Sequence, residues 1–130
     1  MIPAIVLAAG KSTRMGRQKA LLPLGAGQTF LARVVSTFRE AGIEDVVVVV
    51  GHEARAVIAS FDANPASARF VVNHDYEKGQ FSSLLAGLRV VDRPGVVAAL
   101  VTLVDAPLVL ASTVRAVVDR YRQTRAPIVR

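Results

Sequence analysis

The chain has 130 residues, of which 52% are hydrophobic and none is cysteine. This composition supplies a core for one domain, argues against disorder, and excludes disulfides, thiolate metal sites and a cysteine nucleophile. Sixteen Lys and Arg against ten Asp and Glu give a net charge of +6, which favours anionic partners. Aromatic residues make up only 5% of the chain, which disfavours a nucleic-acid surface that stacks bases.

The longest apolar runs are short. They are VVVVV at 46–50 and VVAALVTLV at 96–104, neither of which reaches the length of a membrane span. Met1 is followed directly by IPAIVLAAG, without the basic segment and cleavage site of a secretory signal. We therefore expect a cytoplasmic protein that does not contact a membrane.

Strand-like and helix-like segments alternate from the start of the chain. The apolar run at 3–9 predicts a buried strand, and residues 10–28 are interpreted as turn and loop. Apolar residues at helical spacing then predict a helix that Thr29 can cap and that ends before Gly42. The unbroken valines within 44–52 predict a strand that is buried on both faces.

The second half continues this alternation. We predict helices at 53–61, 81–91 and 111–123, strands at 68–73 and 96–104, a polar loop at 74–80, and the start of another strand at 126–130. Strands that alternate with helices imply parallel pairing through right-handed crossovers. The expected fold is thus a single α/β domain, a doubly wound, mostly parallel sheet with helices on both faces.

Ligands of such sheets bind beyond the carboxyl ends of the strands. The segments expected there are 9–19, Gly51 with His52, 73–80 and 105–107. The first contains Gly10-Lys11-Ser12, which looks like the end of a P-loop, but Ile5 stands where that motif needs its first glycine. A P-loop is therefore excluded.

The segment 7–19 nevertheless suits a polyphosphate. Four basic residues lie within nine positions of a glycine-containing turn and would repel one another without an anion. Arg14 offers a fork of donors that fits phosphate oxygens, whereas Lys19 is a mobile point charge. A solvated basic turn is the alternative interpretation. The residues expected to contact a nucleotide here are Leu7, Ala8, Ala9, Gly10, Ser12, Arg14 and Lys19.

Five segments in order carry a family resemblance: LAAGKSTRMGRQK at 7–19, LLPLG at 21–25, VVVVVGH at 46–52, VNHDYEKGQFSSLLAGL at 72–88 and LVDAPLV at 103–109. Together they resemble the MobA-like NTP transferases, especially the molybdenum cofactor cytidylyltransferases and guanylyltransferases. The resemblance implies a Rossmann-like nucleotide-diphospho-sugar transferase fold. It also implies that an acceptor phosphate attacks the α-phosphorus of an Mg²⁺-bound NTP and that pyrophosphate leaves.

The resemblance also assigns roles to residues. Arg14 and Lys19 would stabilise the departing pyrophosphate, and Asp105 would bind Mg²⁺, although an aspartate there could instead cap a helix or form a turn. The segment 73–87 would close over base and sugar. Its expected nucleotide contacts are Asn73, Gly79, Ser82 and Ser83. His52 and His74 are interpreted as structural or solvated rather than catalytic.

The sequence leaves open the nucleotide, the acceptor and the length of the complete domain. Ala9 favours CTP over GTP by resemblance, and the acceptor is either molybdopterin cofactor or another phosphorylated metabolite such as a sugar 1-phosphate. Family members extend further, so we expect this chain to lack its C-terminal part, including a second metal ligand beyond Arg130. A nucleotide-binding segment without catalytic activity is the alternative, and an exposed sheet edge would allow self-association.

Overall fold

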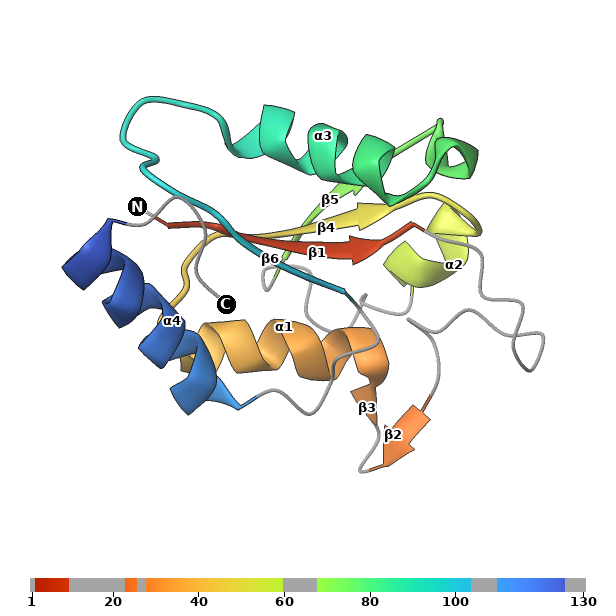
Figure 1. The fold of residues 1–130 in the computed structure, drawn as a ribbon. Coiled ribbons are helices and arrows are strands. Elements are labelled where there is room, and N and C mark those ends of the chain that lie inside the picture. The colour runs from red at the N-terminus through yellow and green to blue at the C-terminus, as the bar shows by residue number, and fades with distance from the viewer. Residues whose placement is uncertain (1, 10–22, 26–27, 60–67, 104–109, 126–130) are drawn as a thin grey trace.

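A parallel four-stranded sheet forms the centre of the molecule (Figure 1). The computed structural model describes residues 2–9, 23–25, 28–59, 68–103 and 110–125. The strands of this sheet are β1 (Ala4–Ala8), β4 (Val46–Val50), β5 (Arg69–Val72) and β6 (Leu100–Leu103), and their order in space is β5-β4-β1-β6. The predicted parallel α/β fold is confirmed.

The strand order reverses beside β1. The chain passes from β1 to β4 and β5 on one side and then returns to form β6 on the other side of β1. Ile5 accordingly pairs with Val47 in β4 and with Val101 in β6. In sheets of this type the reversal opens a crevice at the carboxyl ends of the two strands that flank it. Here those strands are β1 and β6.

Helices cover both faces of the sheet (Figure 1). One face packs against α1 (Phe30–Glu40), α2 (Ala54–Ala59) and α4 (Ala111–Thr124), and the other packs against α3 (Gln80–Val91). Side chains alternate between these faces along each strand. In β1, Val6 therefore belongs to the α1 side of the core and Ile5 to the α3 side.

Local signals predicted several elements correctly. All five valines of β4 are buried, as expected for a strand covered on both faces. Thr29 caps α1, since its Oγ1 accepts a hydrogen bond of 3.1 Å from the Ala32 N–H. Gly42 follows the end of α1 at a φ of +88°, a conformation that favours glycine.

The structure corrects or adds detail to three predicted segments. The loop expected up to residue 28 contains a short antiparallel pair, β2 (Pro23–Gly25) with β3 (Gln28–Thr29). The strand expected from residue 96 begins only at Leu100, because its partner strand begins at Ala4, with which Leu100 is paired. The polar loop at 74–80 contains a 3₁₀ turn, η4 (Tyr76–Lys78). Strand pairing and this turn depend on contacts that hydrophobic periodicity does not encode.

No helix among the described residues combines the length and the apolar character needed to cross a bilayer.

Candidate functional site

The carboxyl ends of three strands are joined by backbone hydrogen bonds. The His52 N–H, just after β4, donates to the Ala9 carbonyl just after β1, at 3.2 Å. The Asn73 N–H, just after β5, donates to the Val50 carbonyl of β4 at 2.7 Å. These bonds extend the sheet slightly beyond its strands. They fix the points from which the candidate ligand-binding segments leave the sheet.

The first predicted contact segment begins inside the core. Leu7 and Ala8 belong to β1, Ala9 follows it, and all three are buried. Leu7 is paired with Leu103 of β6, so the chain continues toward residue 10 and toward residue 104 from neighbouring positions at the strand reversal. Five predicted site residues lie outside the described residues: Gly10, Ser12, Arg14, Lys19 and Asp105. Their roles stay predictions.

Asn73 is the centre of the second segment. Its side-chain amide Nδ2 donates to the hydroxyl oxygens of Ser82 and Ser83, each at 3.0 Å. Its Oδ1 accepts from the backbone N–H of Asp75 at 3.0 Å. Asn73 and Ser83 are both buried. The amide therefore ties the end of β5 to the first turn of α3 and shapes the segment between them.

Ser82 also binds the segment between β5 and α3. Its hydroxyl has two carbonyl acceptors within reach, Gly79 at 2.7 Å and Asp75 at 3.1 Å. Gly79 has a φ of +100°, which an L side chain rarely adopts, so this turn into α3 requires glycine. The structure thus brings together Asn73, Gly79, Ser82 and Ser83. Their predicted contacts to base and sugar stay predictions, but their internal bonds show how the segment keeps its shape.

Tyr76 is a residue of this segment to which the sequence assigned no role. It lies in η4 between Asn73 and Gly79, and its side chain packs against the buried cluster under α3 together with Ala9. The available signal was a single aromatic residue in an otherwise polar loop. Its side chain lies close to Gly51, which is 25 positions earlier, and no local sequence pattern connects the two residues.

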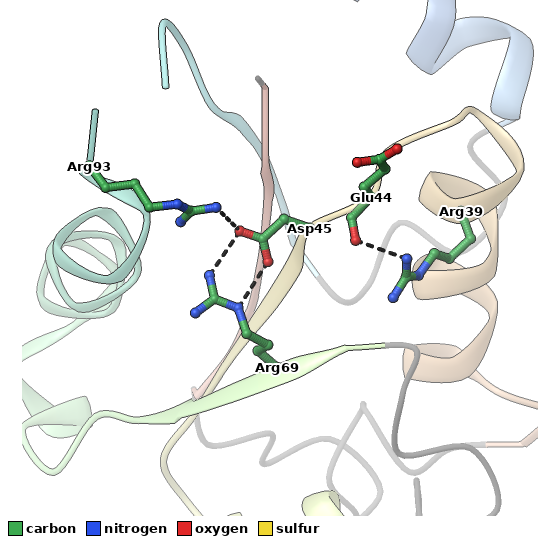
Figure 2. A network of polar contacts seen from close by, with 5 residues as sticks. All are labelled: Arg39, Glu44, Asp45, Arg69 and Arg93. Carbon is green, nitrogen blue, oxygen red and sulfur yellow. Dashed lines mark hydrogen bonds and ion pairs between the residues drawn. The ribbon is translucent and has the colours of Figure 1, made fainter. Parts of the chain in front are cut away.

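A second polar cluster lies at the opposite end of the strands, their amino ends, where Asp45 precedes β4 (Figure 2). The Asp45 carboxylate accepts hydrogen bonds from Arg69 and from Arg93. Burial would raise the pKa of Asp45, but the hydrogen bonds and the positive charges of the two arginines outweigh burial and lower it. Nearby, Arg39 donates to the Glu44 carbonyl at 2.8 Å. This cluster is remote from the carboxyl ends of the strands and joins structural elements.

The described part of the chain contains no group of three or more His, Asp or Glu side chains that could hold a metal ion. The predicted Mg²⁺ ligand, Asp105, is outside that part. Neither of the two described histidines belongs to such a group of three. A metal site therefore stays a prediction that depends on Asp105.

The chain is similar in sequence to proteins of different activities. It is 38% identical to the nicotine blue oxidoreductase of Paenarthrobacter nicotinovorans over 125 residues, which are 95% of this chain and 59% of that protein. It is 40% identical to the bifunctional protein GlmU of Anaeromyxobacter sp. (strain K) over 130 residues, covering 98% of this chain and 26% of GlmU. The chain thus spans well under two thirds of the curated relatives it matches.

Solved structures share the fold. A nucleotidyl transferase from Methanothermobacter is 30% identical with a TM-score of 0.77, covering 92% of this chain and 57% of that one. CMP:2-keto-3-deoxy-manno-octonic acid synthetase, solved with CTP, has the same TM-score of 0.77 over 97% of this chain and 49% of its own length. At 16% identity the latter shows the fold alone. The family model of the MobA-like NTP transferase domain matches residues 4–130, and the chain therefore belongs to the MobA-like NTP transferase family.

Proposed function

We propose that the chain is the nucleotide-binding part of a nucleotidyltransferase that moves CMP from CTP onto a phosphorylated small molecule such as molybdopterin cofactor. The observation that carries this proposal is the position of Leu7, Ala8 and Ala9, the first residues of LAAGKSTRMGRQK. They lie at the carboxyl end of β1 beside the strand reversal of a MobA-like sheet, where ligands of such sheets bind.

The proposed reaction is a direct displacement. A phosphate oxygen of the acceptor attacks the α-phosphorus of the nucleotide, a new P–O bond forms, and the bond to pyrophosphate breaks. Arg14 and Lys19 hold the phosphate oxygens and stabilise the charge that builds up on pyrophosphate. Removal of one such preorganised donor typically costs about 3 kcal/mol of transition-state stabilisation. Mg²⁺ held by Asp105 would supply further charge neutralisation.

The choice of CTP depends on Ala9. This residue is 2% exposed and is followed directly by the predicted phosphate-binding segment. The preference rests on the family resemblance, in which alanine at this position accompanies cytidylyl transfer. CTP is the proposed nucleotide, and GTP is the alternative within the same family.

Calorimetric titration with Mg·CTP, Mg·GTP and Mg·ATP tests the proposal. We expect CTP to bind more tightly than the others, and we expect Arg14→Ala to remove binding. Arg122→Ala, which removes an exposed arginine from α4, is the matched control and should bind CTP as the parent chain does. CTP binding that survives Arg14→Ala, or no binding of any nucleotide, would overturn the proposal. Pyrophosphate release with molybdopterin or with sugar 1-phosphates then separates the acceptors and shows whether the chain is catalytic.

A redox function is the second candidate, because of the 38% identity to a nicotine blue oxidoreductase. Reduction of nicotine blue, with a reduced nicotinamide nucleotide as electron donor, tests it. Dye reduction without pyrophosphate release from any NTP would favour this candidate over the transferase.

A further inference from the structure

The base of the Tyr76 side chain lies against Gly51. A Cβ atom placed on Gly51 would lie 2.6 Å from the Tyr76 Cβ and 2.9 Å from its Cγ. The same atom would lie 3.0 Å from the Cβ of Ala9. Carbon atoms that are not bonded do not approach so closely without displacement. Gly51 is therefore needed for space, because Tyr76 and Ala9 leave no room for a side chain.

The outer end of the Tyr76 ring makes a second contact, with His52. The Tyr76 hydroxyl and the Nδ1 of His52 are 3.5 Å apart, and the two rings are tilted at 56° with centroids 5.8 Å apart. His52 in turn donates its backbone N–H to the Ala9 carbonyl. Tyr76 follows β5 in the chain, yet its contacts are with the ends of β4 and β1.

The ring thus connects the two segments assigned to the nucleotide. On one side, the Tyr76 carbonyl accepts from the N–H of Gly79, the glycine that starts α3. On the other side, Ala9 immediately precedes Gly10 and the basic segment. A displacement of the ring would move the 73–83 segment relative to Ala9 while leaving the strand ladders of the sheet in place.

We propose that Tyr76 is a positioning residue that sets the 73–83 segment, on the base and sugar side, at a fixed place relative to the root of the phosphate-binding segment. The proposal rests on the proposed function. Tyr76 acts through the two segments and is assigned no contact with the nucleotide. Its loss should therefore weaken binding of a whole nucleotide and spare binding of a phosphate chain alone.

Two probes separate these effects, Mg·CTP and Mg·tripolyphosphate, each titrated by calorimetry. We expect Tyr76→Ala to weaken CTP binding about tenfold, equivalent to about 1.4 kcal/mol, and to leave tripolyphosphate binding unchanged. Tyr76→Phe keeps the ring on Gly51 and should bind CTP nearly as the parent chain does. Tyr121→Ala, which removes a tyrosine from α4, outside the segments assigned to the nucleotide, is the matched control. Thermal melting of each variant checks that it is folded.

Gly51→Ala gives an independent test of the contact. The added Cβ would meet the Cβ and Cγ of Tyr76 and must displace that side chain, so Gly51→Ala should weaken CTP binding more than tripolyphosphate binding. Unchanged CTP binding by Tyr76→Ala, or equal weakening of both probes by that variant, would overturn the inference. Failure of the parent chain to bind CTP would instead overturn the proposed function, and this inference with it.

Discussion

Arg69 binds the carboxylate of Asp45 through two parallel hydrogen bonds, Nε to Oδ1 at 2.9 Å and Nη2 to Oδ2 at 2.8 Å (Figure 2). Arg93, which follows α3, donates to the same Oδ2 at 2.9 Å. The Asp45 carbonyl accepts from the N–H of Ala4 at the start of β1. One residue thus joins β1, β4, β5 and the chain beyond α3.

Replacement of this carboxylate should destabilise the fold in a pH-dependent way. The Asp45 side chain is only 12% exposed, and its pKa is lowered from 3.8. A lowered pKa in the folded state gives stability that is present above the unfolded pKa and is lost as the pH falls through the folded pKa. We expect Asp45→Asn to reduce the free energy of unfolding by about 2 kcal/mol at pH 7, and by progressively less below pH 4.

Urea unfolding of both proteins between pH 2 and 7 measures this difference. Glu44→Gln changes the exposed neighbouring carboxylate and should have little effect on stability. A deficit of Asp45→Asn that stays constant down to pH 2 would contradict the assignment.

Asn73→Ala should destabilise the segment between β5 and α3. The change removes the donor to the Ser82 and Ser83 hydroxyls and the acceptor for the Asp75 N–H. Because Ser83 is buried, its hydroxyl loses a partner that water does not readily replace, and the expected cost is about 2 kcal/mol. Chemical denaturation measures it against His74→Ala, an exposed neighbour. Equal stability of the two variants would show that the Asn73 bonds contribute little.

Gly87→Ala should destabilise the protein although alanine favours helices. A Cβ on Gly87 would lie 2.7 Å from the Ile5 Cγ2 and 3.1 Å from the Val49 Cγ2, where α3 crosses the sheet. Overpacking of this kind costs about 1–3 kcal/mol, which exceeds the gain of about 1 kcal/mol in helix propensity. The melting temperature should therefore fall. Leu85→Ala, a half-exposed position on the same helix, is the comparison, and a higher melting temperature for Gly87→Ala than for the parent would refute the close contact.

Thr29→Ala should lower stability by about 1 kcal/mol, because the Ala32 N–H loses its capping acceptor. Thr29→Ser keeps a hydroxyl and should retain most of that stability. Thermal unfolding of the three proteins distinguishes the hydroxyl from the methyl group as the source of the effect. The cap assignment fails if serine and alanine destabilise equally.

The elements that sequence predicted well depend on neighbouring residues. The valines of β4 form one uninterrupted apolar run, and Thr29 and Gly42 bound α1 through interactions that span a few positions. The elements it missed depend on distant partners. The Leu100 boundary reflects where β1 starts, and Asp45 meets Arg69 and Arg93 across 24 and 48 positions.

The candidate site shows the same contrast between local signals and distant partners. The structure shows a closed set of bonds around Asn73 in the segment 73–87, while the predicted contacts of that segment with a nucleotide stay predictions. The sequence did not indicate Tyr76, because the space that this side chain occupies is bounded by Gly51 and Ala9, which follow β4 and β1. Arg14, Lys19 and Asp105 stay predictions from motif and family, since they lie outside the described residues.

The central place of β1 has a consequence for how the chain acquires its structure. Among the four strands of this sheet β1 is made first; it pairs with β4 on one side, and its other side is completed only when β6 has been made. Contacts between residues so far apart in the chain slow folding, and an uncompleted strand exposes an unpaired edge meanwhile. We therefore expect the nascent protein to stay open to aggregation until β6 has emerged from the ribosome, whatever the stability of the finished sheet.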